Sequence, residues 1–255
     1  MNTTTAEKSG STRAFTWKSA GATSKGNVRD HNEDAILDRG EIGLWAVADG
    51  MGGHNAGDLA SRLIVEALAD VNKSARFSAF VDDVDDRLIG VNAELIRRAA
   101  ADANQQMSGS TVAMLLAFDR FCVACWAGDS RVYRYRDGGL KQISRDHSEV
   151  QEMVERGVLT AAAAEAHASA NIVTRAVGGT DNLVLDLELR ELRDRDRFLI
   201  CSDGLYKELS DDDMRGALAT PEPRAACEAL MNRALAGACI DNVSVIVVSF
   251  AAARG

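Results

Sequence analysis

The chain is poor in proline and contains no long apolar run. Its 255 residues include two prolines, Pro221 and Pro223, and no serine- or glycine-rich linker divides the sequence, which favours a single domain. No segment approaches the ~18 apolar residues of a membrane span, and residues 1–13 lack the apolar core of a signal peptide. We therefore expect a cytoplasmic protein without membrane insertion, with a flexible tail over residues 1–15 and one domain over residues 16–255.

Cysteine and histidine patterns typical of disulfide scaffolds or zinc sites are also missing. The five cysteines are an odd number without such spacing. Cys122 and Cys125 form a lone C-x-x-C, but the surrounding FCVACWA is typical of a strand, in which residues three apart point to opposite faces. We interpret the cysteines as reduced, buried thiols.

Positive charge is scarce relative to negative charge. The chain has 29 lysines and arginines against 38 aspartates and glutamates, a formal net charge of −9. Such a chain is repelled by nucleic acid and by anionic membranes, so neither is expected as a partner. The 46% hydrophobic content is sufficient for a sizeable core. We expect a monomer.

Hydrophobic periodicity predicts a mixture of strands and helices. The apolar run at 42–48 (IGLWAVA) indicates a strand covered on both faces. Further strands are predicted at 110–118, 121–127, 131–136, 184–192, 197–202 and 243–250, and helices at 58–68, 81–103, 211–219 and 224–236. Because the strands come in runs and the helices are grouped apart from them, the pattern favours an α+β layered sandwich over a doubly wound parallel sheet.

Local features refine this prediction. The short turns at 119–120 and 128–129 predict antiparallel hairpins. Residues 82–86 are rich in aspartate, which we interpret as solvated carboxylates at the start of a helix rather than as metal ligands. Ser210 and Asp213 have the spacing of a capping box. Residues 147–170 lack a strong apolar face and indicate a surface subdomain.

Four aspartates stand where predicted strands meet loops. Asp49 ends the run IGLWAVA, Asp203 follows the strand RFLICS, and Asp241 precedes the strand VSVIVVSF. If the last two strands are antiparallel, Asp203 and Asp241 share one rim of a sheet, which Asp49 and Asp129 can also reach. Each aspartate alone is better explained as a turn or capping residue. Four of them together reverse that preference.

Such a cluster predicts a metal site. Crowded carboxylates repel one another unless cations lie between them. Oxygen ligands favour magnesium or manganese, and Gly50, directly after Asp49, leaves room for its backbone carbonyl to approach a metal. Arg29 is a candidate phosphate ligand because its planar guanidinium can bind two oxygens. The alternative for Arg29 is a surface pair with Glu33 or Asp34, worth roughly 0–1 kcal/mol.

Seven short motifs follow one another along the chain. They are VRDHNED at 28–34, VADGMGGH at 47–54, GST at 109–111, AGDSR at 127–131, DHS at 146–148, CSDGL at 201–205 and DNVS at 241–244. Each motif is weak alone, but their joint order is specific. Together they resemble the metal-dependent protein phosphatases, also called type 2C, in their short bacterial form, and the resemblance covers residues 21–250.

The resemblance implies a fold and a reaction. The expected fold is a four-layer α-β-β-α sandwich of two antiparallel sheets flanked by helices, with a flap subdomain at about 147–176. The expected activity is that of a phosphoserine/phosphothreonine protein phosphatase, a phosphoric monoester hydrolase with two Mn²⁺ or Mg²⁺ per active site. A metal-bridging hydroxide would attack phosphorus directly, without a phosphoenzyme.

The resemblance also implies roles for individual residues. Asp49 matches the carboxylate that bridges both metals, with the Gly50 carbonyl on one metal and Asp203 and Asp241 on the other. Asp129 matches the residue that, with Asp203, holds a weaker third metal. The expected catalytic residues are Arg29, which matches the phosphate-binding arginine, and Glu33 and Asp34, which match acids that orient metal-bound water.

Several alternatives remain open. Some relatives carry a histidine, proposed as general acid, where this chain has Met51, so either His54 or a metal-bound water could protonate the leaving group. A catalytically silent relative would only dock phosphorylated proteins. A partner-switching phosphatase would act in sigma-factor regulation, but such relatives generally lack the motif at 29–34.

Residues 43–58 indicate a possible subgroup. They are similar to the corresponding segment of phosphatases found with bacterial type VI secretion systems, where these oppose a membrane serine/threonine kinase. The expected partners are therefore phosphorylated proteins, such as a Ser/Thr kinase and its substrates.

Overall fold

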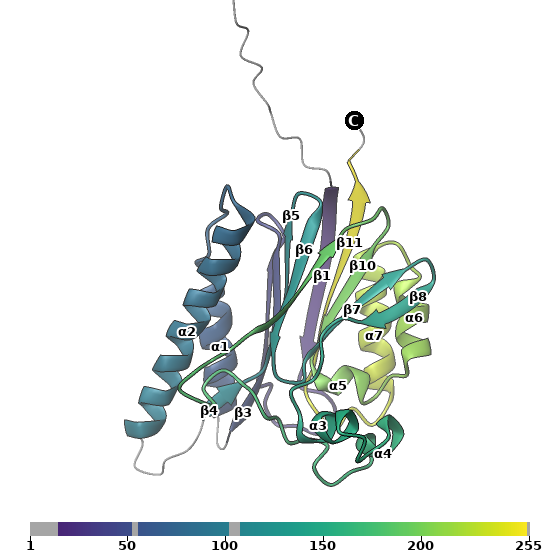
Figure 1. Cartoon of the computed structure of the whole chain (residues 1–255). Coiled ribbons are helices and arrows are strands. Elements are labelled where there is room, and N and C mark those ends of the chain that lie inside the picture. Colours follow the sequence, from purple (N-terminus) through teal and green to yellow (C-terminus); the bar gives the residue numbers. More distant parts are fainter. Residues whose placement is uncertain (1–14, 53–55, 102–107, 254–255) are drawn as a thin grey trace, which may run out of the picture.

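Two antiparallel sheets form the centre of the molecule. The computed structural model describes residues 15–52, 56–101 and 108–253. Sheet A has the strand order β1-β11-β10-β7-β8, and sheet B has the order β2-β3-β5-β6-β9, with β4 paired to the end of β3 (Figure 1). The strands of sheet A are β1 (Phe15–Ser24), β7 (Arg131–Arg136), β8 (Gly139–Gln142), β10 (Arg197–Cys201) and β11 (Val243–Ala252). Those of sheet B are β2 (Asp34–Arg39), β3 (Leu44–Gly52), β4 (Ser108–Ser110), β5 (Val112–Phe118), β6 (Phe121–Ala127) and β9 (Asp186–Glu191).

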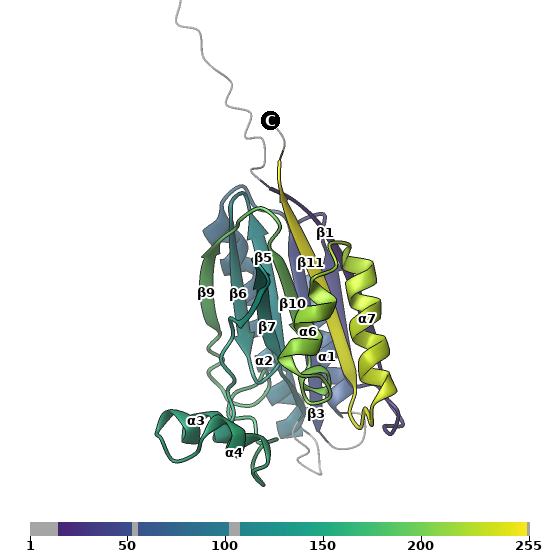
Figure 2. The same ribbon diagram turned by 90° about the vertical axis from the view of Figure 1, so that its right-hand side faces the viewer.

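Helices cover the outer faces of both sheets. Figures 1 and 2 show α1 and α2 over sheet B, and α6 and α7 over sheet A. These helices are α1 (Ala56–Ala69), α2 (Phe77–Ala101), α6 (Asp211–Leu218) and α7 (Pro223–Ala236). The predicted four-layer sandwich is confirmed. No helix in the described ranges is both long enough and apolar enough to cross a bilayer.

Three apolar layers hold the sandwich together. Trp45, Phe198 and Phe250 lie in the layer between the sheets. A second layer joins sheet B to its helices, and a third joins sheet A to its helices. Within the run at 42–48, the strand begins at Leu44 and is covered on both faces, as predicted: Trp45 packs between the sheets, whereas Leu44 and Ala46 face α1 and α2. Each fully buried large side chain contributes about 1.5–3 kcal/mol to folding.

The cysteines occupy these layers as expected. Cys122 lies between the sheets, and Cys125, three residues later, packs on the helix side of sheet B. All five cysteines are free and buried. Burial raises the pKa of both Cys122 and Cys125 to about 12, so neither thiol is ionised at neutral pH.

The predicted hairpin at 128–129 is wrong. The strand before this turn, β6, belongs to sheet B, and the strand after it, β7, belongs to sheet A. Gly128 has φ +114°, and a Cβ atom there would lie 2.5 Å from the Thr111 Cβ. A left-handed residue packed against the neighbouring strand lets the chain cross from one sheet to the other within three residues.

Other differences are smaller. The strands β1 and β8 were not predicted, and Phe15, expected in the tail, is buried and begins β1. The preceding residues 1–14 lie outside the described part of the chain. Helix α2 begins at Phe77, so the aspartates at 82–86 lie in its second and third turns rather than at its N-terminus.

The surface subdomain contains two short helices. They are α3 (Glu149–Glu155) and α4 (Ala161–Glu165), which lie beyond one end of the sheets in Figure 2. Backbone bridges join Ser148 to Val173 and Ser110 to Val177. The subdomain is thus attached to the sandwich near the end of β4.

Helix α6 provides a test of the capping box. The Ser210 side chain accepts a hydrogen bond from the Asp213 N–H, and the Asp213 side chain accepts one from the Ser210 N–H. Replacing Ser210 with alanine should lower the free energy of unfolding by about 1 kcal/mol. Denaturant unfolding measures this change. The neighbouring exposed Asp212→Ala should lower it by less than about 0.5 kcal/mol, and equal effects of the two variants would contradict the cap.

Candidate metal centre

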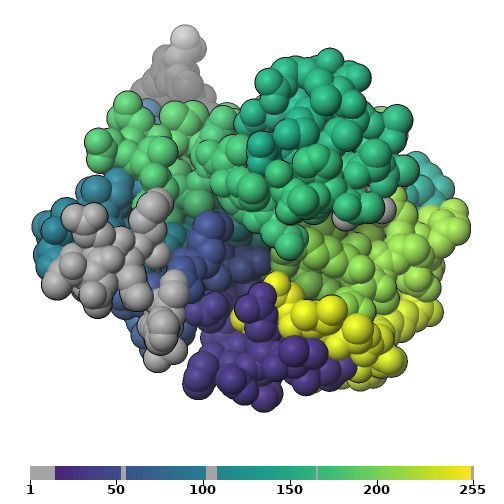
Figure 3. Space-filling model, turned by 90° about the horizontal axis from the view of Figure 1, so that it is seen from below, coloured from purple at the N-terminus to yellow at the C-terminus, as the bar shows by residue number. Residues whose placement is uncertain are grey.

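Strand pairing brings the predicted aspartates to one end of the sandwich. In sheet B, Asp34 and Asp49 are direct partners on β2 and β3. In sheet A, Cys201 of β10 pairs with Val245 of β11. Asp203, two residues after β10 and at the start of α5 (Asp203–Tyr206), therefore lies near the loop that contains Asp241. Figure 3 looks onto this end of the molecule.

Asp49 is at the centre of this group. It is partly exposed, but burial in the surrounding protein raises its pKa well above the usual value, and four neighbouring carboxylates raise it further. These neighbours are Asp34, Asp203, Asp129 and Asp241. The structure thus brings together all four aspartates predicted as metal ligands, and Asp34 with them.

Asp34 is buried and incompletely hydrogen-bonded. Its Oδ2 accepts a hydrogen bond from Ser202 Oγ at 2.8 Å, whereas the buried Oδ1 has no hydrogen-bond partner. Burial raises the pKa of Asp34 to about 7, partly offset by hydrogen bonds from Ser244 and Ser202. A buried carboxylate oxygen without a partner is costly, and a nearby cation or bound water would supply one.

Backbone contacts hold Asp49 and Gly50 in place. The Asp49 carbonyl accepts hydrogen bonds from the Thr111 N–H at 2.9 Å and from Ser110 Oγ at 3.0 Å. The Gly50 N–H donates to the Glu33 carbonyl at 3.2 Å. A Cβ atom on Gly50 would lie 2.2 Å from the carbonyl oxygen of Gly57, so no other residue fits there.

Asn242 fixes the loop that carries the predicted catalytic residues. Its Oδ1 accepts from the Glu33 N–H at 2.8 Å, and its Nδ2 donates to the carbonyls of Lys25 and His31. Sequence reasoning assigned no role to Asn242. A polar residue directly before a strongly apolar strand was the available signal, because such an amide must find partners.

Two cations contact the carboxylates. Arg29 Nη2 donates to Asp241 Oδ2 at 2.9 Å, and this contact raises the Arg29 pKa. Arg29 thus pairs with Asp241 and not with Asp34, one of the two alternative partners. The charge of Glu33, the other alternative, also raises the Arg29 pKa. Lys207 forms an ion pair with Asp203 and donates to Asn171 Oδ1 at 2.7 Å.

The donor set fits hard divalent cations, although the side chains are not arranged around one. Within the described ranges, no three acidic, histidine or cysteine side chains stand close enough to hold an ion as they are placed. Asp203 and Asp241 instead accept from Lys207 and Arg29. Five clustered aspartates against two cations leave an excess of negative charge that oxygen-preferring Mg²⁺ or Mn²⁺ would offset.

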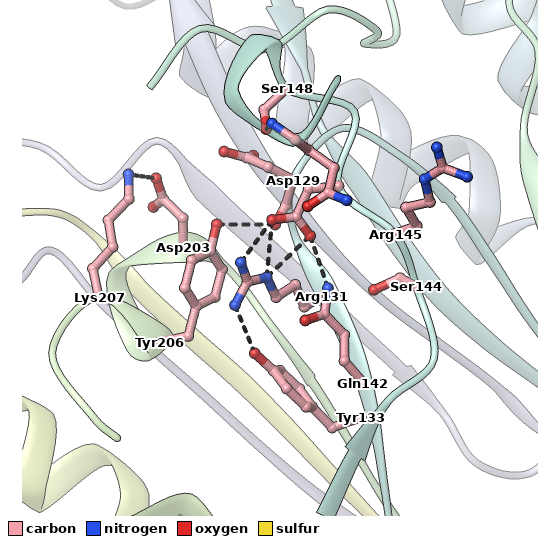
Figure 4. A network of polar contacts seen from close by, with 12 residues as sticks. Asp129, Arg131, Tyr133, Gln142, Ser144, Arg145, Ser148, Asp203, Tyr206 and Lys207 are labelled. Carbon is pink, nitrogen blue, oxygen red and sulfur yellow. Dashed lines mark hydrogen bonds and ion pairs between the residues drawn. The ribbon is translucent and has the colours of Figure 1, made fainter. Parts of the chain in front are cut away.

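A cleft lies beside Asp129, between α5 and the surface subdomain. Its volume is about 870 Å³. In its wall, Arg131 binds both oxygens of Asp146 at 2.7–3.1 Å, and its guanidinium lies 3.6 Å from the centre of the Tyr206 ring (Figure 4). The Tyr206 hydroxyl donates to the Asp129 carbonyl at 3.1 Å. These contacts connect the root of the subdomain to the acidic rim.

One candidate cannot be placed. His54, the possible general acid, lies outside the described residues, as do its neighbours Gly53 and Asn55.

Comparisons with known proteins agree with this geometry. The family model of protein phosphatase 2C matches residues 23–237. The serine/threonine protein phosphatase PstP of Mycobacterium tuberculosis is 34% identical over 228 residues, which are 89% of this chain and 44% of that protein. The chain thus spans less than half the length of this relative.

Two solved structures are similar over nearly their whole length. PppA, described as a key regulatory component of T6SS in Pseudomonas aeruginosa, is 40% identical with a TM-score of 0.85, covering 91% of this chain and 97% of that one. The catalytic domain of PstP in complex with 2 manganese ions is 32% identical with a TM-score of 0.84, covering 93% and 99%. From the matched residues 23–237, the shared sandwich and the acidic rim, we conclude that this chain belongs to the protein phosphatase 2C family, in its bacterial form.

Proposed function

We propose that the chain is a metal-dependent protein phosphatase that hydrolyses phosphoserine and phosphothreonine. The observation that carries this proposal is the position of Asp49, which pairs with Asp34 across β2 and β3 and lies within electrostatic range of Asp129, Asp203 and Asp241. The names of its relatives, serine/threonine protein phosphatases, support the substrate class.

The proposed ligands are residues of that rim. Asp49 and the Gly50 carbonyl would hold one Mn²⁺ or Mg²⁺, and Asp49 with Asp203 and Asp241 the other. Asp129 with Asp203 would hold a weaker third ion. When bound, these ions activate water and neutralise charge on the phosphoryl group. The manganese complex of PstP supports two ions of this kind.

The remaining residues would act on substrate and water. Arg29 is half exposed, so its guanidinium can exchange Asp241 for a phosphate without leaving solvent. Glu33 is held beside Arg29 by Asn242. The unpartnered Oδ1 of Asp34 can accept a hydrogen bond from a water and thereby orient it.

The biological setting is proposed by analogy. The likeness to PppA supports a role in regulating a type VI secretion system, in which the chain would oppose a bacterial Ser/Thr kinase in signal transduction. We propose a cytoplasmic monomer in which residues 147–176 form a flap next to the substrate. A silent docking protein is less well supported because Asp49, Asp203, Asp241 and Arg29 are all retained. The retained motif at 29–34 likewise disfavours a partner-switching phosphatase.

The first prediction concerns the ligands. Asp49→Asn, Asp203→Ala and Asp241→Ala should each lower Mn²⁺-dependent hydrolysis of a phosphothreonine peptide at least about a hundredfold, because each removes a carboxylate that would hold an activating cation. Circular dichroism should show a retained fold, since the rim lies outside the apolar layers. Asp212→Asn, on the exposed face of α6, is the control and should keep full activity.

Two outcomes would contradict this assignment. Wild-type protein that releases no phosphate with Mn²⁺ or Mg²⁺ would favour the docking protein instead. Full activity in any of the three variants would remove that residue from the metal site.

The second prediction concerns pH and metal removal. Burial and the charge of Asp203 raise the pKa of Asp129 from 3.8 to about 7. The folded, metal-free protein therefore holds the Asp129 proton more tightly than the unfolded chain does. As the pH rises from about 4 to about 7, this difference lowers the free energy of unfolding. Asp129→Asn removes this loss. In EDTA, its Tm should exceed that of wild type by several degrees at pH 8, and this difference should shrink as the pH falls toward 4.

Thermal unfolding from pH 4.5 to pH 8 measures the difference, where 1 kcal/mol corresponds to about 2–4 °C in a domain of this size. The control is Asp212→Asn, whose side chain is 83% exposed. Its Tm difference from wild type should not depend on pH. A pH-independent difference for Asp129→Asn as well would show that Asp129 is not an unneutralised buried acid.

A further inference from the structure

A group of cationic side chains lies on the flank of the sandwich, away from the acidic rim. On this flank, seen in Figure 2, β7 and the edge strand β8 of sheet A stand beside β9, the edge strand of sheet B. Arg134 and Lys141 are direct cross-strand partners on β7 and β8, so their side chains share one face. Arg136 reaches across to sheet B, where its Nη2 donates to the Glu191 carbonyl at 3.1 Å. Arg190 on β9 completes the group.

Their proximity is visible at Cys122. This buried thiol pairs in register with Arg190, and the charges of Arg134, Arg136 and Arg190 all act on its pKa. Three guanidinium groups from two different sheets therefore surround one side chain of β6.

Two of these cations have carboxylate partners. Arg136 binds both oxygens of Asp196 at 2.5–2.6 Å, and Asp196 is fully buried. Arg190 forms an ion pair with Glu188 at 2.5 Å. These pairs neutralise Arg136 and Arg190: the first joins β7 to the start of β10 within sheet A, and the second lies within β9.

Arg134 and Lys141 are different. Within the described ranges, neither side chain forms a hydrogen bond or an ion pair, and the Arg134 Nε is buried without an acceptor. Burial lowers the pKa of Arg134, and the charges of Arg136 and Arg190 lower it further, although the charge of Asp196 offsets part of this effect. Like charges placed directly opposite each other on neighbouring strands are unfavourable. An anion between them would reverse this cost.

We propose that Arg134 and Lys141 form a binding site for a phosphate group on the flank between the two sheets. Arginine offers a planar fork and lysine a point charge, the pair of groups that phosphate oxygens accept best. Arg131, in the wall of the cleft, stands three residues earlier on β7, about 10 Å along the strand, and its side chain lies on the opposite face of sheet A from Arg134. In a chain of net charge −9, this local excess of positive charge selects the place where an anion can bind.

The phosphate has two possible sources. It is either a second phosphoryl group of a multiply phosphorylated substrate protein or the inorganic phosphate that the proposed reaction releases. The identity of the source rests on the proposed function, whereas the site itself does not.

The test is the double variant Arg134→Gln/Lys141→Gln, with Lys73→Gln/Arg76→Gln as control. The control removes the same charge from an exposed loop between α1 and α2. Isothermal titration of inorganic phosphate into the metal-free proteins excludes binding to bound metals. Wild type and control should bind phosphate at this site, and the double variant should bind it at least about tenfold more weakly, the effect of losing one charge-assisted hydrogen bond.

Thermal unfolding is a second readout of the site. Since the two cations repel each other, the double variant without phosphate should have a Tm equal to or above that of wild type. Added phosphate should raise the Tm of wild type by more than it raises the Tm of the double variant. Equal phosphate binding by wild type and double variant, or no binding by wild type, would overturn the proposal.

Peptide kinetics then separate the two sources. For a substrate-borne phosphate, the double variant should raise KM about tenfold for a doubly phosphorylated peptide, with unchanged kcat and unchanged KM for the singly phosphorylated one. If inorganic phosphate is the ligand, neither KM changes although the calorimetric site is lost. Failure to hydrolyse either peptide would reject the proposed function and leave the calorimetric test of the site intact.

Discussion

Electrostatic repulsion among the rim aspartates is the constraint to which the rest of the structure is adapted. Asp34, Asp49 and Asp129 are surrounded by protein, and the charge of Asp203 acts on all three; both effects raise the pKa of each. Such a cluster opposes folding, so it must be held by parts of the molecule that are stable on their own. The three apolar layers provide that stability, and the hydrogen bonds of Ser202, Thr111 and Asn242 transmit it to the rim. Cations bound there would then relieve a strain that the fold already tolerates.

Strand register determines which side chains meet at the acidic rim. Asp34 faces Asp49 because β2 and β3 pair in one register, and a slip of one residue would turn either side chain to the opposite face. The same holds for β10 and β11, which place Asp203 and Asp241. Charge is divided accordingly, with acids at the strand ends and uncompensated cations on the flank, where the edges of the two sheets meet.

The parts that were predictable depend on short-range patterns. Asp49, Asp203 and Asp241 follow or precede strongly apolar strands, so their positions at strand ends could be inferred without coordinates. The prediction of a hairpin at 128–129 was wrong because a short connection does not specify which sheet the next strand joins. The packing of Gly128 against Thr111 determines this. Strand β1 was missed because FTWKSAGATS lies at a sheet edge and half of its residues are polar or charged. The roles of Asn242 and Arg134 depend on contacts more than fifty residues away in sequence or on another sheet, which periodicity does not report.

The pairing of the first and last strands has a mechanical consequence. Phe15 stands opposite Ala252, so the two ends of the described chain leave the sandwich side by side, at the end opposite the acidic rim (Figure 1). A load applied to these two ends would pull β1 and β11 apart like a zipper, breaking their hydrogen bonds one after another instead of shearing them all at once. Anchoring by either end would leave the acidic rim facing away from the support, whereas tension between the two ends would peel off β1 first.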